Sequence, residues 1–273
     1  MTTPLYLFVT SDRPDQYLNS ILHCLRDKNI VIVIFLYVEN APWGSNSSSS
    51  TMSVRGRVET LLSKLASEGK YRYFSGPKKD TDEDLQAHYT PEEVAHIRGK
   101  YTSFKDRRTF WRDEVIDYYQ LREKLARIRK RDPSSIFDVT SLGKEYLGDI
   151  IALGLFEGIE EIYSFKFLSS PSSKFDTPWK LLFHDLEYRG NPESGYDYIN
   201  LTKTPICDNY SKKVVTRKIP LSFSLGAAII LLLTLIITSF IFGTTNWFAL
   251  SVTSLATIAS IFSLIFTILP LRK

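Results

Sequence analysis

A run of 53 residues near the carboxyl terminus, 219–271, contains no Asp, Glu, Lys or Arg. All 30 acidic residues and 32 of the 34 basic residues precede it, so the chain divides into a charged part and an apolar tail. This division excludes a wholly soluble protein. It also excludes a polytopic transporter, because one hairpin's length of apolar chain cannot surround a transport pathway alone.

The apolar run has the pattern of two membrane-spanning helices. Residues 221–242 and 247–269 are each just over twenty residues long, which at about 1.5 Å per residue gives roughly 33 Å, enough to cross a hydrocarbon core of about 30 Å. Residues 243–246 form an uncharged polar turn. The flanking basic residues are Lys212, Lys213, Arg217, Lys218, Arg272 and Lys273. By the positive-inside rule we predict a two-pass protein of the inner (cell) membrane, embedded in the lipid bilayer, with both termini cytoplasmic.

The second span carries small and hydroxyl-bearing residues on one helical face. They are Thr253, Ala256, Thr257, Ser260, Ser263 and Thr267. Such a face either packs helices closely or lines a pore in an oligomer, and the sequence leaves both readings open. We expect a homo-oligomer, dimeric or higher. A selective ion channel is not indicated, because no charged residue lies at membrane depth.

Strands and helices alternate in the charged part of the chain, as expected of an α/β protein. The apolar, β-branched run IVIVIFLYV at residues 30–38 predicts a central parallel strand. The other expected strands are residues 5–10, 71–74, 136–140 and 161–167, with helices from Pro14 to about 28, at 54–67 and at 145–156. Residues 179–188 and 196–202 suggest a late hairpin. We therefore predict a Rossmann-like, mainly parallel sheet flanked by helices.

Residues 75–135 interrupt this alternation. A helix is expected after Pro91, and a long charged helix over about 107–131. The predicted organisation is a cytoplasmic domain of residues 1–205 with a helical insertion at about 80–132, a basic linker at 206–220 and the two-helix transmembrane hairpin at 221–269. Acidic and basic residues alternate along the insertion, so we expect a solvated face and no binding of a DNA or RNA duplex.

The cysteines and histidines do not suggest a metal or disulfide framework. Cys24 lies in an apolar helical context that predicts a buried free thiol in a reducing compartment, and the only other cysteine is Cys207. The four histidines lack the Cys/His spacing of a zinc site. We expect neither a metal nor a cofactor.

One loop has the composition of a ligand site. The segment FDVTSLGK, residues 137–144, joins a predicted strand to a predicted helix. Ligands of parallel sheets bind at the carboxyl ends of strands, where helix amino termini present N–H groups, and hydroxyls, a glycine and a lysine suit a phosphate or ribose. The loop after the first strand would lie on the same edge. The candidate ligand-binding residues are Thr10, Ser11, Arg13, Asn40, Thr140, Ser141, Gly143 and Lys144. We predict no catalytic residue.

This arrangement resembles a known family. A strand, the motif Asp138-x-Thr140-x-x-x-Lys144 and a helix, late in a Rossmann-like domain, are similar to the ligand motif of CARF domains and the related SAVED-type sensors. The resemblance covers residues 1–205 in topology. It implies binding of a cyclic or linear oligonucleotide second messenger in a prokaryotic antiviral system, and such sensors are fused to diverse effectors, including two-transmembrane hairpins. The residues that match the two family loops are Thr140, Ser141, Gly143, Lys144, Thr10 and Ser11.

The resemblance and the hairpin together predict a non-enzymatic membrane effector of an antiphage system. Binding of a cyclic oligonucleotide would control how protomers assemble and thereby disrupt the inner membrane. Whether the ligand activates or restrains the effector stays open. One alternative is a membrane-anchored nucleotide-processing enzyme, in which Glu39 at the end of the second strand could be catalytic. The other is a non-catalytic scaffold that recruits a protein partner.

Overall fold

The structure is a computed structural model that describes residues 3–40, 53–107, 109–168, 177–187 and 195–205. Residues 1–208 form one compact unit. The predicted linker and transmembrane hairpin, residues 206–269, lie outside the described residues. Within the described ranges, no helix is both long enough and apolar enough to cross a membrane.

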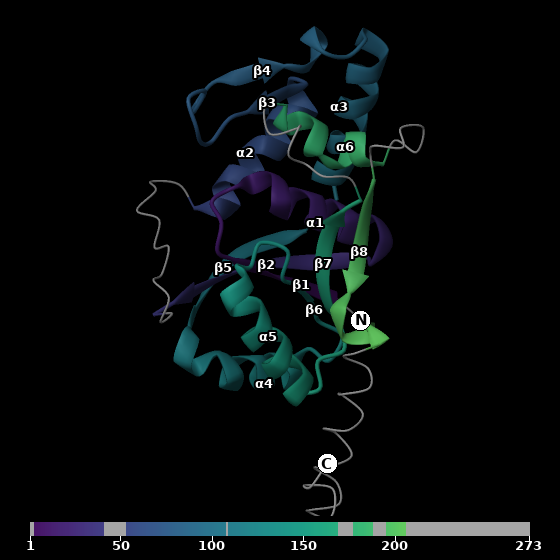
Figure 1. Ribbon diagram of the computed structural model, residues 1–273. Coiled ribbons are helices and arrows are strands. Elements are labelled where there is room, and N and C mark those ends of the chain that lie inside the picture. The colour runs from purple at the N-terminus through teal and green to yellow at the C-terminus, as the bar shows by residue number, and fades with distance from the viewer. Residues whose placement is uncertain (1–2, 41–52, 108, 169–176, 188–194, 206–273) are drawn as a thin grey trace, which may run out of the picture. The chain divides into compact units, whose positions relative to one another are not determined.

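A six-stranded sheet forms the centre of the domain, in the order β5-β2-β1-β6-β7-β8 (Figure 1). The strands are β1 (Thr3–Val9), β2 (Ile30–Glu39), β5 (Phe110–Asp117), β6 (Ile136–Asp138), β7 (Ile162–Phe167) and β8 (Tyr196–Asn200). Every neighbouring pair is parallel except β7 and β8, which are antiparallel. The predicted Rossmann-like, mainly parallel sheet is confirmed.

Helices cover both faces of this sheet, as Figure 1 shows. Helices α1 (Pro14–Asp27) and α2 (Val54–Ser67) lie on one face, and α4 (Leu121–Arg131) and α5 (Lys144–Phe156) on the other. Side chains of a strand point alternately to the two faces. In β1, Leu5 and Leu7 therefore belong to the core beneath α1 and α2. Tyr6 and Phe8 belong to the core beneath α4 and α5.

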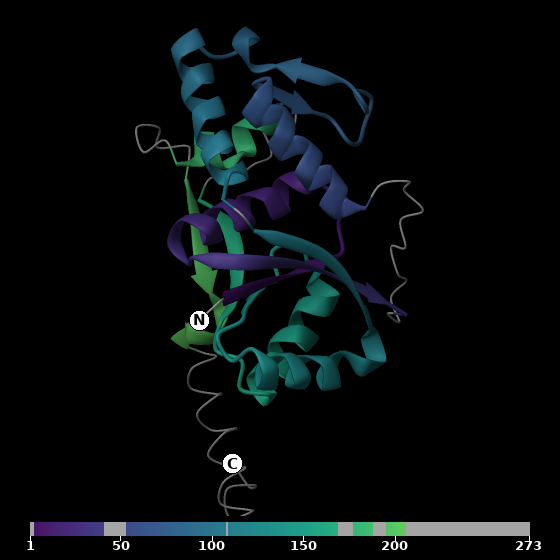
Figure 2. The same ribbon diagram turned by 180° about the vertical axis from the view of Figure 1, so that it is seen from behind.

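A small subdomain packs beyond α2 (Figures 1 and 2). It consists of the strands β3 (Lys70–Arg72) and β4 (Asp82–Asp84), the turn η1 (Leu85–Ala87) and the helix α3 (Pro91–Lys105). The strand predicted at 71–74 thus does not join the main sheet, because β3 pairs with β4 in a separate antiparallel sheet. An ion pair of 3.1 Å between Arg72 and Asp82 links the two strands. The helix expected after Pro91 is confirmed as α3.

The prediction of one long helix over residues 107–131 is wrong for the first half of that range. Residues 110–117 form β5, a short turn η2 (Tyr118–Gln120) follows, and only α4 is helical. The region predicted as a helical insertion therefore contributes a strand to the main sheet. The physical reason is that the backbone N–H and C=O groups at the edge of β2 need hydrogen-bond partners, and β5 supplies them along the whole length of β5. The ring centroid of Trp111 in β5 lies 5.9 Å from that of Phe35 in β2.

The prediction of a late hairpin is correct only for the second of its two strands. Residues 196–200 form β8, whereas the segment predicted as its partner forms the turn η4 (Pro178–Leu181) and the short helix α6 (Phe183–Leu186). Burial of Trp179 and Phe183 in the core over α1 favours this compact turn. A hydrogen bond of 2.8 Å joins Nδ1 of His184, in α6, to Tyr101 Oη. Burial lowers the pKa of His184 to about 3, so the imidazole stays neutral.

Helix α5 approaches β7 closely at one glycine. A Cβ atom built on Gly154 would lie well inside the van der Waals contact distance from Ile162 Cδ1, and Ile162 is 1% exposed. Gly148, on the same helix, has no atom within 4 Å of its built Cβ. Only the first of these two glycines is therefore required by packing.

We expect Gly154→Ala to lower the free energy of unfolding by about 1–3 kcal/mol, because Ile162 must move in a packed core. The matched Gly148→Ala variant should instead raise it by about 0.5–1 kcal/mol, through helix propensity. Urea denaturation followed by circular dichroism measures both. The double variant Gly154→Ala/Ile162→Val lacks the Cδ1 atom that the new methyl group would meet, so it should regain part of the lost free energy of unfolding. If Gly154→Ala and Gly148→Ala change this free energy equally, Gly154 is not required by packing.

Candidate functional site

The direction of winding reverses between β1 and β6. From β1 the chain builds outward to β2 and β5, and from β6 it builds outward on the other side to β7 and β8. β1 and β6 are parallel neighbours, with Leu5 opposite Ile136 and Leu7 opposite Asp138. The loops that follow these two strands therefore meet at the same edge of the sheet, the usual place of ligand sites in open α/β sheets.

Hydrogen bonds join the two loops directly. Thr10 Oγ1 donates to the carbonyl of Ser141. Ser141 Oγ donates in return to the carbonyl of Phe8 at 2.5 Å. The convergence expected from the sequence is thus present. Both hydroxyls are used within the protein, so they fix the loops rather than stand free for a ligand.

Asp138, at the end of β6, organises the second loop. It is 2% exposed, and its Oδ1 accepts from the backbone N–H of Thr140 at 3.0 Å. Its Oδ2 accepts from Thr140 Oγ1 at 3.0 Å and from Tyr198 Oη at 2.7 Å. Thr140 Oγ1 also accepts from the N–H of Phe165 in β7, at 2.8 Å. Burial raises the pKa of Asp138, while these donors act in the opposite direction by stabilising the carboxylate.

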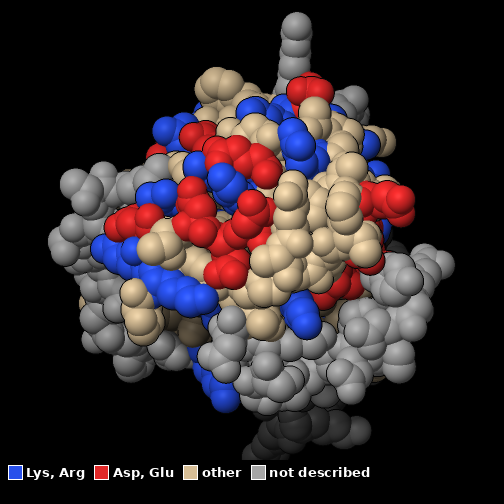
Figure 3. Space-filling view, turned by 90° about the horizontal axis from the view of Figure 1, so that it is seen from above, with Lys and Arg blue, Asp and Glu red and all other residues tan. Residues whose placement is uncertain are grey.

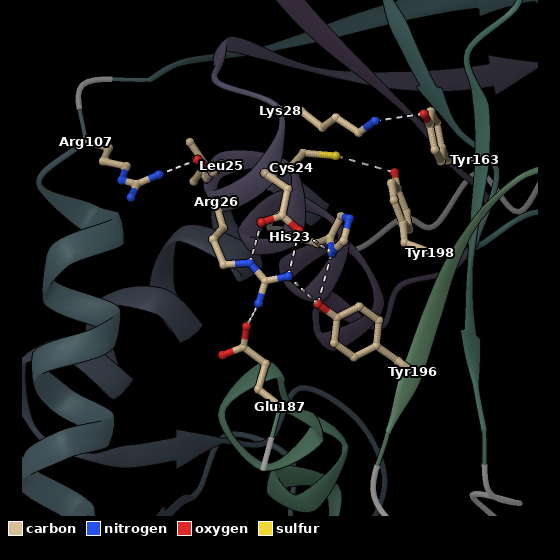
Figure 4. Close-up of polar contacts among 11 residues, drawn as sticks. His23, Cys24, Leu25, Arg26, Lys28, Arg107, Tyr163, Glu187, Tyr196 and Tyr198 are labelled. Atoms are coloured by element: carbon tan, nitrogen blue, oxygen red, sulfur yellow. Dashed lines mark hydrogen bonds and ion pairs between the residues drawn. The ribbon is translucent and has the colours of Figure 1, made fainter. Parts of the chain in front are cut away.

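Further hydrogen bonds connect Tyr198 and Tyr196 in β8 to helix α1, as Figure 4 shows. Tyr198 Oη accepts from Cys24 Sγ at 3.6 Å, and Tyr196 Oη contacts His23 Nδ1 at 2.9 Å. Burial raises the pKa of the Cys24 thiol to about 12, and the predicted buried free thiol is confirmed. Helix α1 thus holds β8, the last described strand, beside the loop after β6.

The remaining predicted residues of the first two strands have separate roles. The N–H of Ser11 donates a hydrogen bond to Tyr17 Oη at 3.1 Å, and Tyr17 Oη donates one to the carbonyl of Ser11 at 2.8 Å. Arg13, the N-cap residue of α1, forms an ion pair of 2.7 Å with Asp15. Asn40 lies at the end of β2, but its amide donates to Asp117 at 2.7 Å, at the end of β5. No contact among the described residues joins Asn40 to the loop after β6.

Gly143 and Lys144 begin helix α5. Gly143 is the N-cap residue, and it has no side chain with which to cap the helix. The first N–H groups of α5 are therefore left for backbone, solvent or a ligand. The side chain of Lys144 is exposed. A helix amino terminus and a lysine together favour an anionic group such as a phosphate.

Sequence reasoning missed two features of this region. The first is the role of Asp138 as an acceptor for Tyr198, since nothing local in the sequence connects residues sixty positions apart. The second is a cavity of about 430 Å³ beside the first loop, to which the β3–β4 connection contributes aromatic residues. Arg13 is the predicted site residue that lines this cavity.

The surface around β3, β4 and α3 carries both signs of charge. Figure 3 shows Lys and Arg next to Asp and Glu over this face rather than one continuous basic surface. In the part of the chain that the structure describes, no group of three or more His, Cys, Asp or Glu could hold a metal ion. The expectations of no duplex binding and no metal stay predictions.

Comparisons with known proteins give limited similarity. No protein-family model matches the chain, and no curated protein matches it. Among solved structures it is similar to Enterococcus italicus Csm6 bound to cyclic hexa-2'-fluoro-hexa-dAMP, with 11% sequence identity and a TM-score of 0.38. The match covers 93% of this chain and 53% of that chain, so this chain spans about half the length of the Csm6 chain. A TM-score this low does not establish a common fold.

We expect Tyr198→Phe to lower the free energy of unfolding by about 1–3 kcal/mol, because the buried Asp138 loses a hydrogen-bond donor. It should also raise the pKa of Asp138 further. Because the pKa of Asp138 is higher in the folded state than in the unfolded state, the free energy of unfolding falls as the pH rises through the folded-state pKa. The difference in this free energy between the variant and the wild type should therefore be largest at neutral pH. Urea denaturation between pH 4 and pH 8 measures this (roughly the range in which a raised carboxyl titrates).

Tyr196→Phe is the matched control for this prediction. It lies on the same strand, and its hydroxyl contacts His23 and Arg26 instead of Asp138. We expect this variant to lower the free energy of unfolding by less than about 1 kcal/mol, because the Arg26 side chain is 40% exposed and solvent weakens its contacts. If the two variants are equally destabilised at every pH, Asp138 does not depend on Tyr198.

Proposed function

We propose that the described domain is a CARF-like sensor of a cyclic oligonucleotide second messenger. It acts as the non-enzymatic regulatory part of a membrane effector in an antiphage system. The observation that carries the proposal is the meeting of the loops after β1 and β6 at the reversal point of a parallel sheet. A phosphodiester at this edge would meet Lys144 and the amino terminus of α5, both suited to negative charge.

The hydroxyls of this edge would act indirectly. The side chains of Thr10, Thr140 and Ser141 form hydrogen bonds within the chain, so they join the two loops to each other before a ligand arrives. Preorganised loops reduce the ordering cost of binding. In this proposal, Lys144 and backbone N–H groups contact the ligand, and the hydroxyls position them.

Asp138 offers a route from the ligand to the carboxyl-terminal part of the chain. Its side chain bonds both Thr140 in the ligand loop and Tyr198 in β8. β8 is the last strand before the predicted linker at 206–220. A ligand that binds one arrangement of this loop more tightly than another would shift the position of β8 and, with it, the assembly of protomers. Disruption of the inner membrane by the hairpin follows from that assembly.

We expect the full-length protein, purified in detergent, to bind at least one member of a panel of cyclic oligonucleotides. Lys144→Ala should weaken that binding by about 1–3 kcal/mol, or roughly five- to 150-fold, through loss of a charge-assisted contact. Isothermal titration calorimetry gives both values. The matched control is Lys130→Ala, an exposed lysine in the last turn of α4, which precedes β6 and thus lies toward the opposite edge of the sheet. A folded protein that binds no member of the panel would refute the proposal.

Replacing the hairpin separates the effector from the two alternatives. An unrelated two-helix anchor in place of residues 221–269 should abolish growth arrest while ligand affinity stays unchanged. An anchored enzyme or a scaffold would keep its activity, since the hairpin then serves only as an attachment. The measurement is survival of expressing cells together with ligand affinity of the exchanged protein. Continued growth arrest with a foreign anchor would contradict a membrane-disrupting role.

A further inference from the structure

Strand β5 forms an open edge of the main sheet. It is the outermost strand and pairs with β2 through all of its 8 residues. Among the residues that the structure describes, no strand pairs with its other side. A strand in this position presents unpaired backbone N–H and C=O groups, which form a template for another strand. The carbonyl of Trp111 accepts from Arg55 at 3.0 Å, and because a carbonyl oxygen has two lone pairs, this contact does not prevent pairing.

Large apolar side chains are exposed along this edge. Of the six that are exposed among the described residues, three lie on β5 or directly after it. They are Phe110 (64% exposed), Val115 (56%) and Tyr119 (75%). The charged residues 112–114 lie between the first two of them. An exposed edge with apolar side chains marks an interaction site, and its central charges select the strand that fits opposite.

The contacts of β5 show which face of the sheet each side chain occupies. Trp111 packs against the core beneath α1 and α2, and Ile116 belongs to the core beneath α4 and α5. Because side chains alternate along a strand, the odd-numbered positions share the first face and the even-numbered positions the second. When two copies of one strand pair antiparallel in a continuous sheet, residues of the same face lie opposite each other. A two-fold axis then passes beside one residue of each copy.

One register of this kind pairs opposite charges and apolar residues. With Asp113 on the two-fold axis, the opposing pairs are Arg112 with Glu114, Trp111 with Val115 and Phe110 with Ile116, each formed twice. Such pairs stabilise a sheet. Asp113 meets its own copy, but its carboxylate pairs with Arg55 of the same chain at 3.3 Å. Centring the axis on Arg112 or Glu114 instead places no basic residue of β5 opposite an acidic one.

Two buried polar atoms fit the same register. Arg112 Nε and Glu114 Oε2 are buried, and neither has a hydrogen-bond partner among the described residues. The two side chains share a face of the strand, with Arg112 Nη2 4.0 Å from Glu114 Oε2. Glu114 Oε1 already accepts from Lys124. Buried polar atoms are nearly always hydrogen-bonded, and a guanidinium from a second copy, opposite Glu114, would supply the missing donor.

We propose that two copies of this protein pair antiparallel through β5, about Asp113, and join their two sheets into one. The inference deepens the proposed function, on which it rests for the role of the contact, by naming a surface through which protomers assemble. β5 lies at one end of the sheet, whereas β1 and β6 lie at its centre. The contact therefore uses neither Lys144 nor the amino terminus of α5, and it forms without a ligand.

The test is disulfide cross-linking of the full-length protein in detergent, without ligand. Cys207→Ser is the background, which leaves the buried Cys24 as the remaining cysteine. Asp113→Cys should cross-link to a dimer under mild oxidation, because directly opposite Cα atoms lie about 4.5–5.5 Å apart, within disulfide range. Val115→Cys is the matched control on the same face. Val115 is more exposed than Asp113, but the register places its two copies more than about 12 Å apart, so it should not cross-link.

A mixture of two variants tests the register independently of Asp113. Arg112→Cys and Glu114→Cys proteins that carry tags of different mass should cross-link to each other, and neither should cross-link to itself, because like positions lie about 8 Å apart. This mixture keeps the test valid if Asp113→Cys fails to fold. In the Asp113→Cys protein, Glu114→Arg should lower cross-linking about threefold or more by placing like charges opposite each other, and Arg112→Glu/Glu114→Arg should restore it.

The outcomes separate this inference from the proposed function. Absence of a cross-link both in Asp113→Cys and in the mixture would overturn the inference, and so would cross-linking of Val115→Cys to the same extent as Asp113→Cys. A cyclic oligonucleotide that binds in a Lys144-dependent manner would leave the proposed function intact in each of those cases. Conversely, register-specific cross-linking of a protein that binds no cyclic oligonucleotide supports the β5 contact while the proposed function fails.

Discussion

A buried carboxylate at the reversal point of the sheet determines the geometry of this domain's candidate ligand edge. Asp138 is almost fully removed from water, so its oxygens must be hydrogen-bonded within the protein. They accept from Thr140 in the same loop and from Tyr198 in β8. Loop, sheet edge and last strand are therefore constrained together, and a change in one of them disturbs the hydrogen bonds of the others.

The second constraint is the layer beyond α2, which places aromatic residues beside the amino terminus of α1. The strands β3 and β4 pair with each other in a separate sheet and pack with α3 over one face of the domain. Two regions with different chemistry result. The loops after β1 and β6 offer a helix terminus and a lysine, which suit phosphate, whereas the pocket offers aromatic rings and a buried carboxylate, Asp15, that is already paired with Arg13. Arg13 stands between them.

Several parts of the fold could be predicted because their patterns are unambiguous. The apolar run of residues 30–38, rich in β-branched residues, favours a strand, and the 3.6-residue periodicity of residues 54–67 favours a helix; both formed as expected. Residues 107–131 were ambiguous, because Trp111 and Val115 fit either period. Residues 179–188 resemble a strand in composition, yet burial of Trp179 and Phe183 against other elements favours turns and a short helix.

The amino-acid sequence alone determined the division into a charged domain and a charge-free tail, the α/β class, and the segment 137–144 as a strand–loop–helix junction, because composition and local periodicity are properties of adjacent residues. Only the tertiary structure decided that β5 completes the sheet beside β2, that the hydroxyls of Thr10 and Ser141 bond to the chain, and that Tyr198 reaches Asp138. Each of these depends on which backbone or side-chain group lacks a partner once the chain is packed, and no local pattern carries that information.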